Sequence, residues 1–236
     1  GVKDTMHDLD SSNARLQWMK GDIAALMNDD ASTAGSETPN AVAQEWMKEI
    51  DSTTGVISCV GMFATSNDVM RQMNGDANRA LIETVKNAGA AHMVYVSAYE
   101  VEKHLPFKVI PGYFEGKRIA ERAVHEHFGS KGTILQPGMV YGTRVKGGAK
   151  IPLGVIGKPL EALFTAPLLN QLQHSIPYIG KLAFSPPVSV HDVAKAAVRA
   201  ATGTRPLPTG GAEKGGEEGV GGAFVMDIEK IRKVID

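Results

Sequence analysis

Short apolar runs alternate with longer stretches of helical periodicity through the middle of the chain. The apolar runs are residues 55–61 (GVISCVG), 92–97 (HMVYVS) and 133–136 (TILQ). Helical spacing of apolar side chains covers residues 70–88 and 112–128 between them. Strand–helix alternations that repeat in this way are difficult to place in any architecture other than a parallel sheet with helices on both faces. The sequence therefore predicts an α/β fold, a doubly wound parallel sheet of the Rossmann-like kind.

The bulk composition excludes several classes of protein. With 236 residues, 43% of them hydrophobic and 22% charged, the chain can bury a substantial core. Its net charge of −1 gives no strong field to gather nucleic acid, so no nucleic-acid partner is expected. The single cysteine, Cys59, is expected at the buried end of a strand and excludes an intrachain disulfide. No metal site is expected, because the histidines lack metal-ligand spacing, and no stretch approaches the ~20 apolar residues of a transmembrane segment.

Two residues with complementary chemistry stand one helical turn apart. Tyr113 and Lys117, in GYFEGK, project from the same face of a predicted helix. A phenol with a pKa near ~10 is a poor general acid-base at neutral pH, and a neighbouring ammonium favours its anionic form. Ser97 ends a predicted strand, at the edge where open α/β sheets bind ligands, and could bind a substrate carbonyl. The pattern predicts a catalytic Tyr113, Lys117 and Ser97, although an isolated pair of this spacing is usually an exposed tyrosine beside a solvated lysine.

Four segments in order carry a family resemblance: YFEGKRIAE, ILQPGMVYGTR, KIPLGVIGKPLE and FSPPVSVHDVAKAAVRAA. Together they resemble the extended or atypical short-chain dehydrogenase/reductases, over about residues 55–201. The sequence is most similar to the organellar subgroup that includes the coenzyme-Q-biosynthesis-associated reductase-like proteins. More distantly it resembles the 39-kDa-type accessory subunit of mitochondrial complex I. The resemblance implies an organellar location, in a mitochondrion or a chloroplast.

The resemblance implies a nicotinamide cofactor, NADP or NAD, and a set of residues around it. Tyr113 and Lys117 match the catalytic tyrosine and lysine of the family, with Lys117 also reaching the ribose hydroxyls. The implied cofactor-binding residues are Asp22, Ile23, Cys59, Val60, Gly61, Lys117 and Pro137. For two of them a structural interpretation is equally open: Asp22 as a turn residue after a strand, and Cys59 as a small core hydrophobe.

The glycine loop that receives the cofactor's pyrophosphate in this family is not found ahead of Leu16. We expect either that this unit lies upstream of Gly1 or that the protein has lost its cofactor. Residues 16–23 (LQWMKGDI) instead have the pattern of a strand that ends in a Gly-Asp turn.

The chain is expected to divide into two regions. Residues 1–142 form the nucleotide-binding core, and residues 143–236 form a substrate-side or lid region. Within the second region we expect a helix at 190–201, a flexible glycine-rich loop at 203–222, and a short strand or helix in the last dozen residues.

Two functions remain open at this point. The first is an NAD(P)-binding reductase-like enzyme that transfers hydride to a quinone-like or isoprenoid substrate. The second is a non-catalytic accessory or assembly subunit that docks in an organellar membrane complex, respiratory or photosynthetic. A third and weaker hypothesis is a regulator that binds the nucleotide without turnover.

Overall fold

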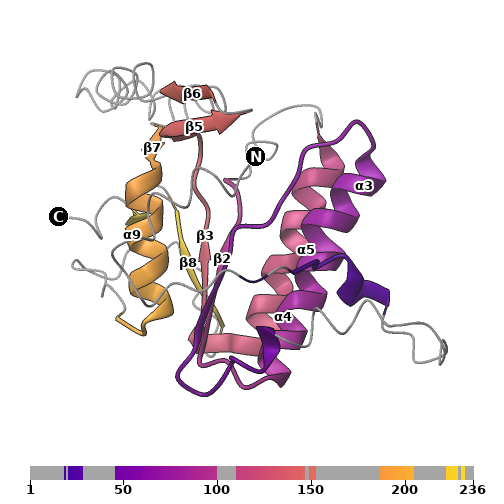
Figure 1. Cartoon of the computed structure of the whole chain (residues 1–236), viewed down its shortest axis with the longest axis vertical. Helices are drawn as coiled ribbons and strands as arrows, with labels where there is room; N and C mark the ends of the chain where they lie inside the picture. The colour runs from indigo at the N-terminus through magenta and orange to yellow at the C-terminus, as the bar shows by residue number, and fades with distance from the viewer. Residues whose placement is uncertain are drawn as a thin grey trace.

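A four-stranded parallel sheet forms the centre of the molecule in the computed structural model (Figure 1). The structure describes residues 19, 21–28, 46–99, 110–146, 149–152, 187–204, 222–227 and 230–231. The strands, in their spatial order, are β1 (Gly55–Ser58), β2 (His92–Val96), β3 (Gly132–Leu135) and β8 (Phe224–Met226). Each adjacent pair is parallel. The predicted parallel sheet is confirmed, and of the two alternatives expected near the C-terminus, a short strand or a helix, the strand β8 is its fourth member.

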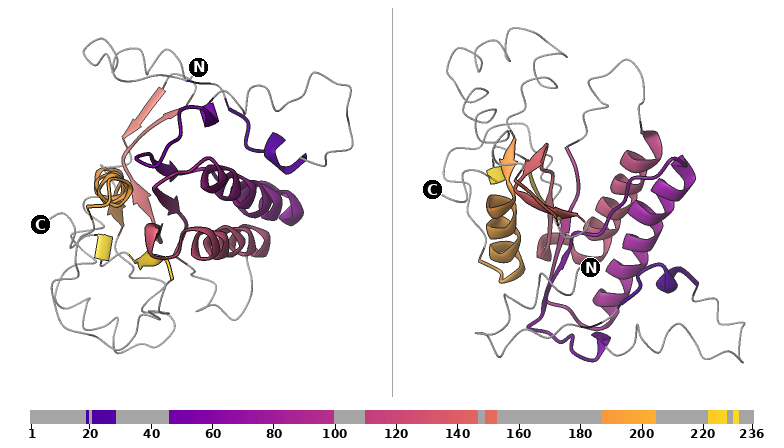
Figure 2. Two further views of the ribbon diagram at one scale, coloured as in Figure 1. Left: turned by 90° about the horizontal axis from the view of Figure 1, so that it is seen from below. Right: turned by 45° about the horizontal axis from the view of Figure 1, so that its top comes forward.

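Helices cover both faces of this sheet, as Figures 1 and 2 show. One face carries a continuous run of α3 (Asn67–Arg71), the π-helical turn η3 (Gln72–Asp76) and α4 (Ala77–Asn87), with α5 (Pro111–Phe128) beside it. The other face carries α9 (Val190–Ala201), so the helix expected at 190–201 is confirmed. The result is a three-layer α/β arrangement, the doubly wound form that the alternating pattern predicts.

The side chains of β2 show how the two faces are divided. Met93 and Tyr95 are fully buried in the cluster under α4 and α5, whereas Val94 is buried in the cluster under α9. Successive side chains of a strand point to opposite faces, so an all-apolar strand serves two cores at once. This explains why HMVYVS is a continuous apolar run without alternation.

Smaller elements surround the sheet. Two strand pairs lie outside it, one parallel and one antiparallel: β4 (Val140–Tyr141) with β7 (Val188–Ser189), and β5 (Thr143–Lys146) with β6 (Ala149–Pro152). Two 3-10 turns complete the described elements: η2 (Ala25–Asn28) and η5 (Gly129–Lys131). The expected flexible loop at 203–222 falls almost entirely outside the described residues, and the division at residue 142 stays a prediction.

A glycine contact sets how closely α5 approaches the π-helical turn. A Cβ on Gly116 would stand 2.9 Å from the carbonyl oxygen of Arg71 and 3.0 Å from the backbone nitrogen of Gly75. Backbone atoms cannot yield as a flexible side chain can, so a larger residue here would push the helices apart. The close approach lets one face of α5 reach the ends of β1 and β2.

One expected strand is absent from the residues that the structure describes, and another ends earlier than expected. Residues 16–23 were expected as a strand, but the described Met19 and residues 21–23 are irregular and lead into η2. The carboxylate of Asp22 accepts a hydrogen bond of 2.9 Å from the backbone of Ala24, which closes a turn in place of a strand. The strand expected at 55–61 ends at Ser58, because later side chains take up the backbone groups that follow.

Candidate active site

The carboxyl ends of β1 and β2 meet the first turns of α5, and Lys117 lies at the centre of this region. Its side chain is 4% exposed, and its Nζ donates a 3.1 Å hydrogen bond to the carbonyl oxygen of Val96, at the end of β2. The same Nζ lies 4.8 Å from the ring centroid of Tyr95 and 5.7 Å from that of Tyr113. Tyr113 and Lys117 therefore share one face of the helix, and that face points to the edge of the sheet where ligands bind.

Burial dominates the acid-base properties of this pair. It lowers the pKa of Lys117 to about 8, against the opposing effects of Cys59 and Glu121. Burial also raises the pKa of Tyr113, and the charge of Arg118 opposes that rise. The expected lowering of the phenol's pKa by an adjacent ammonium is thus not the net result in this structure. A phenol with a raised pKa stays protonated at neutral pH, which suits a proton donor.

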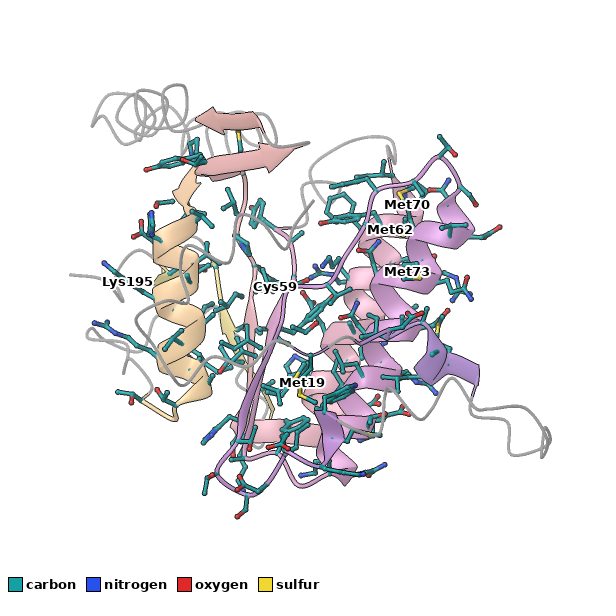
Figure 3. The ribbon with its side chains drawn as sticks, in the orientation of Figure 1. Met19, Cys59, Met62, Met70, Met73 and Lys195 are labelled. Atoms are coloured by element: carbon teal, nitrogen blue, oxygen red, sulfur yellow. The ribbon has the colours of Figure 1, made fainter. Side chains whose placement is uncertain are left out.

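The segment that follows β1 brings Cys59, Val60 and Gly61 to the same place. Cys59 is exposed rather than buried, contrary to the expectation from its apolar run, because the strand has already ended. Figure 3 shows it near the end of the strand. A Cβ on Gly61 would lie 3.1 Å from Nζ of Lys117 and 2.7 Å from Oδ1 of Asn74. Only glycine lets this backbone pass so close to the ammonium.

Two buried asparagines hold this segment, and the sequence analysis missed both. Oδ1 of Asn74 accepts from the backbone of Met62 at 3.1 Å, and its Nδ2 donates to the carbonyl oxygens of Met62 at 2.8 Å and Met70 at 2.7 Å. Asn78 accepts from the hydroxyl of Ser58 at 2.9 Å and donates to the carbonyl oxygen of Val60 at 3.4 Å. The available signal was a pair of asparagines four residues apart on a helix face that is otherwise apolar.

Phe63 is a further residue of the site, and no sequence pattern singles it out. Its ring stacks on Tyr113 with centroids 4.4 Å apart and planes inclined by 14°. Phe114 packs against the same tyrosine in a T-shaped arrangement at 5.2 Å. Phe63 is 69% exposed, so its outer face is open while its inner face covers the phenol. Tyr113 is consequently only half-buried, with one ring face protected.

Ser97 is buried and joined to a polar network. Its hydroxyl accepts a 3.2 Å hydrogen bond from Nη2 of Arg118, and Arg118 also donates to the carbonyl oxygen of Ala98 at 2.8 Å. Nη1 of Arg118 pairs with Glu121 at 2.6 Å, and Glu121 accepts from the side chain of Gln136 at 2.8 Å. The network connects the carboxyl ends of β2 and β3 across α5.

Pro137, Asp22 and Ile23 are the remaining residues of the predicted cofactor-binding set. Pro137 is buried just beyond β3, and its carbonyl oxygen accepts from the backbone of Tyr99 at 2.9 Å, so it lies beside the end of β2. Asp22 is exposed and its carboxylate closes its own turn, as in the structural interpretation. Ile23 packs against the apolar cluster under α4 and α5. The described contacts of these two residues do not join them to Lys117.

Two features are absent from the part of the chain that the structure describes. No group of three or more His, Cys, Asp or Glu side chains there could hold a metal ion. No helix there has the length and apolar character that a membrane span requires.

No family model matches the chain. An uncharacterised chloroplastic protein of Arabidopsis thaliana is 31% identical over 192 residues, which cover 81% of this chain and 58% of that protein. Among solved structures, the UDP-glucuronic acid 4-epimerase of Bacillus cereus in complex with NAD is similar, with a TM-score of 0.52 and 16% identity. The match covers 96% of this chain and 64% of the epimerase, so the chain spans less than two thirds of either protein.

A similarity at this level of identity establishes the fold and leaves the chemistry open. The parallel strand order, the helices on both faces and the match to the epimerase agree with one another. The chain has an α/β, Rossmann-like fold of the kind found in this NAD-bound epimerase.

Proposed function

We propose that this chain is the reductase-like part of an NAD(P)-dependent protein of the short-chain dehydrogenase/reductase type. The observation that carries the proposal is the buried Lys117 ammonium, held between the carbonyl oxygen of Val96 and the ring of Tyr113 at the ligand-binding edge of the sheet. Ionisable groups with strongly shifted pKa values cluster at functional sites. The fold, which resembles that of an NAD-bound epimerase, supports the same proposal.

The residues at this edge fit the nicotinamide and ribose end of such a cofactor. The described hydrogen bond to Val96 uses one of the three donors of Lys117, which leaves donors for ribose hydroxyls. Gly61 keeps the space beside that ammonium clear, since a Cβ there would stand 3.1 Å from Nζ. The described residues contain no strand, glycine loop and helix for the pyrophosphate, so we assign only Lys117, Gly61, Pro137 and their neighbours to the cofactor.

When bound, the cofactor would supply the hydride that reduces a substrate carbonyl. Tyr113 gives its phenolic proton to the carbonyl oxygen, and the resulting phenolate takes a proton from solvent. One hydride and one proton are then added across the C=O bond. The hydroxyl of Ser97 donates to the same oxygen and orients it, while the charge of Lys117 favours the phenolate as it forms. We propose a quinone-like or isoprenoid carbonyl compound as the substrate, because Phe63, which stacks on Tyr113, and the preceding Met62 are apolar and exposed and would contact it.

The location that we propose is an organelle, with the chloroplast as first choice and the mitochondrion as second. The support is the Arabidopsis relative, whose name places that protein in the chloroplast.

A substitution at Tyr113 tests the enzymatic function. Tyr113→Phe should abolish NAD(P)H oxidation with a short-chain benzoquinone as the acceptor, because the proton donor is gone. Nucleotide affinity, followed by nicotinamide fluorescence, should stay nearly the same, because the ring and its packing on Phe63 remain. Turnover in the variant equal to that of the unsubstituted protein would rule out this mechanism.

A second candidate is the accessory or assembly subunit. It is favoured by apolar side chains that stand exposed along β1 and after it: Ile57, Val60, Met62 and Phe63. Exposed apolar patches often mark contacts with other proteins. This candidate predicts co-purification with a larger membrane assembly, and a monodisperse monomer in native extracts would count against it.

A further inference from the structure

We infer that Arg118 is a positioning residue of this site: its guanidinium orients the hydroxyl of Ser97 and holds a positive charge at the end of β2, where Lys117 also binds the strand and contacts Tyr113. The inference rests on the proposed function. It assigns a role to Arg118, which the proton transfer by Tyr113 and Lys117 does not itself require. Arg118 directly follows Lys117, so it leaves α5 about 100° around the helix from that lysine and reaches the end of β2 by another route.

The geometry fixes which way the Ser97 hydroxyl can donate. Nη2 of Arg118 stands 3.2 Å from Oγ of Ser97, and a guanidinium has donors but no acceptor. The oxygen of Ser97 therefore accepts in this contact, and its own proton is left to donate in another direction. A substrate carbonyl oxygen at the edge of the sheet is an acceptor of the required kind. Arg118 thus keeps Ser97 ready as a donor.

The guanidinium is itself held firmly. It donates to the carbonyl oxygen of Ala98 at 2.8 Å and pairs with Glu121 at 2.6 Å. The side chains of Arg118 and Glu121 are only 20% and 11% exposed. Gln136 holds the other oxygen of Glu121 at 2.8 Å. A planar fork with partners on several sides cannot swing away from the site as a lysine on a flexible stem can.

The position of this charge also affects the phenol. Arg118 is the group whose charge lowers the pKa of Tyr113 against the effect of burial. An arginine stays protonated at every pH of interest, whereas the pKa of Lys117 lies at about 8. The charge that favours the phenolate is therefore constant above the pH at which Lys117 begins to lose its own. Other titratable or charged groups on the elements around Tyr113 are Cys59 after β1, Asp68 and Arg71 on α3, Asp76 on η3, His92 and Tyr95 on β2, and Glu115, Lys117, Glu121, Arg122, His125, Glu126 and His127 on α5.

The test is a titration of Tyr113 that needs neither cofactor nor turnover. The absorbance of tyrosinate near ~295 nm is followed against pH in the intact protein and in Tyr113→Phe, and the difference isolates Tyr113. Circular dichroism at each pH defines the range in which the protein is folded. The variants are Arg118→Gln, Arg118→Lys and the double variant Arg118→Gln with Glu121→Gln, which leaves no unpaired carboxylate. Arg122→Gln is the matched control, because Arg122 is on the same helix but exposed.

We expect the midpoint of Tyr113 to rise in Arg118→Gln and in the double variant, to rise by less in Arg118→Lys, and to stay in place in Arg122→Gln. In turnover, Arg118→Lys should raise KM more than it lowers kcat, since the charge remains but Ser97 is less well oriented. An unchanged midpoint in a folded Arg118→Gln or double variant would overturn the electrostatic part of the inference, and an unchanged KM in Arg118→Lys would overturn the positioning of Ser97. A rise in Arg118→Lys equal to that in Arg118→Gln would also overturn the electrostatic part, because repacking rather than charge would then be responsible. A protein without any NAD(P)H oxidation would instead remove the proposed function and leave the titration readable.

Discussion

Asn74 offers a quantitative test of how the segment after β1 is held in place. In Asn74→Ala, three hydrogen bonds are lost, to the backbone nitrogen and oxygen of Met62 and to the oxygen of Met70. Met62 is 39% exposed, so water can replace two of these bonds, whereas Met70 is 3% exposed and water reaches it poorly. With a net value of about 1 kcal/mol for each replaceable bond and about 1–2 kcal/mol for the buried one, we expect a loss of about 3–4 kcal/mol in the free energy of unfolding.

Urea unfolding followed by tryptophan fluorescence measures this loss, and Asn87→Ala is the control. Asn87 lies at the exposed end of α4, so its substitution should change the free energy of unfolding by less than about 0.5 kcal/mol. Cys59 gives a second measurement, because it is the single thiol of the chain and follows β1 directly. Although the side chain of Cys59 is solvent-exposed, partial desolvation by the surrounding protein raises the pKa of its thiol, so release of the segment should speed its reaction with a thiol reagent. A loss below about 0.5 kcal/mol with an unchanged thiol rate would refute the role given to Asn74.

Two further predictions concern Lys117 and Phe63. Burial lowers the pKa of Lys117 from 10.5 in the unfolded chain to about 8 in the folded protein. Between about pH 8 and pH 10.5 the unfolded chain therefore binds more protons at this lysine than the folded protein does, and the contribution of Lys117 to the free energy of unfolding rises with pH over that range. Lys117→Met should remove that rise and stabilise the protein at pH 7 by up to roughly 3 kcal/mol, as measured by urea unfolding at pH 7 and 9.5. The same pH dependence of stability in the variant and in the unsubstituted protein would contradict this prediction. Phe63→Ala should expose Tyr113 and bring its pKa down towards 10, with a loss of about 1 kcal/mol of stacking; a tyrosinate titration identical to that of the intact protein would count against the stacking.

The strands and helices could be predicted because their signals are local. The apolar runs of β2 and β3 and the helical period of α5 are visible within windows of a few residues. The end of β1 could not be predicted in this way. Its apolar run continues past Ser58, but Asn74 and Asn78, more than a dozen residues later, take the backbone groups of Met62 and Val60. The end of β1 is set by hydrogen bonds from side chains that are distant in the sequence, so the apolar run itself contains no signal for it.

The residues of the candidate site likewise fall into those that local sequence signals predict and those that depend on contacts between distant segments. Tyr113, Lys117 and Ser97 could be proposed from residue type and spacing, and the structure brings the first two together around Val96. The stacking of Phe63 and the network of Arg118 depend on the three-dimensional approach of α5 to the ends of the strands. That approach depends on Gly116, whose importance comes from the backbone opposite it and not from its neighbours in the sequence.

The burial of Lys117 bears on the choice between an enzyme and an accessory subunit. Its ammonium is 4% exposed, and its contacts among the described residues are a carbonyl oxygen and two aromatic rings, with no carboxylate in an ion pair. A buried charge of this kind costs stability, and an apolar side chain of similar volume would fill the same space at lower cost. A protein that kept the fold only as a docking surface would gain nothing from such a lysine. Its presence beside Tyr113 therefore favours the view that the site still binds a ligand, through the hydrogen-bond donors of the ammonium that Val96 does not use.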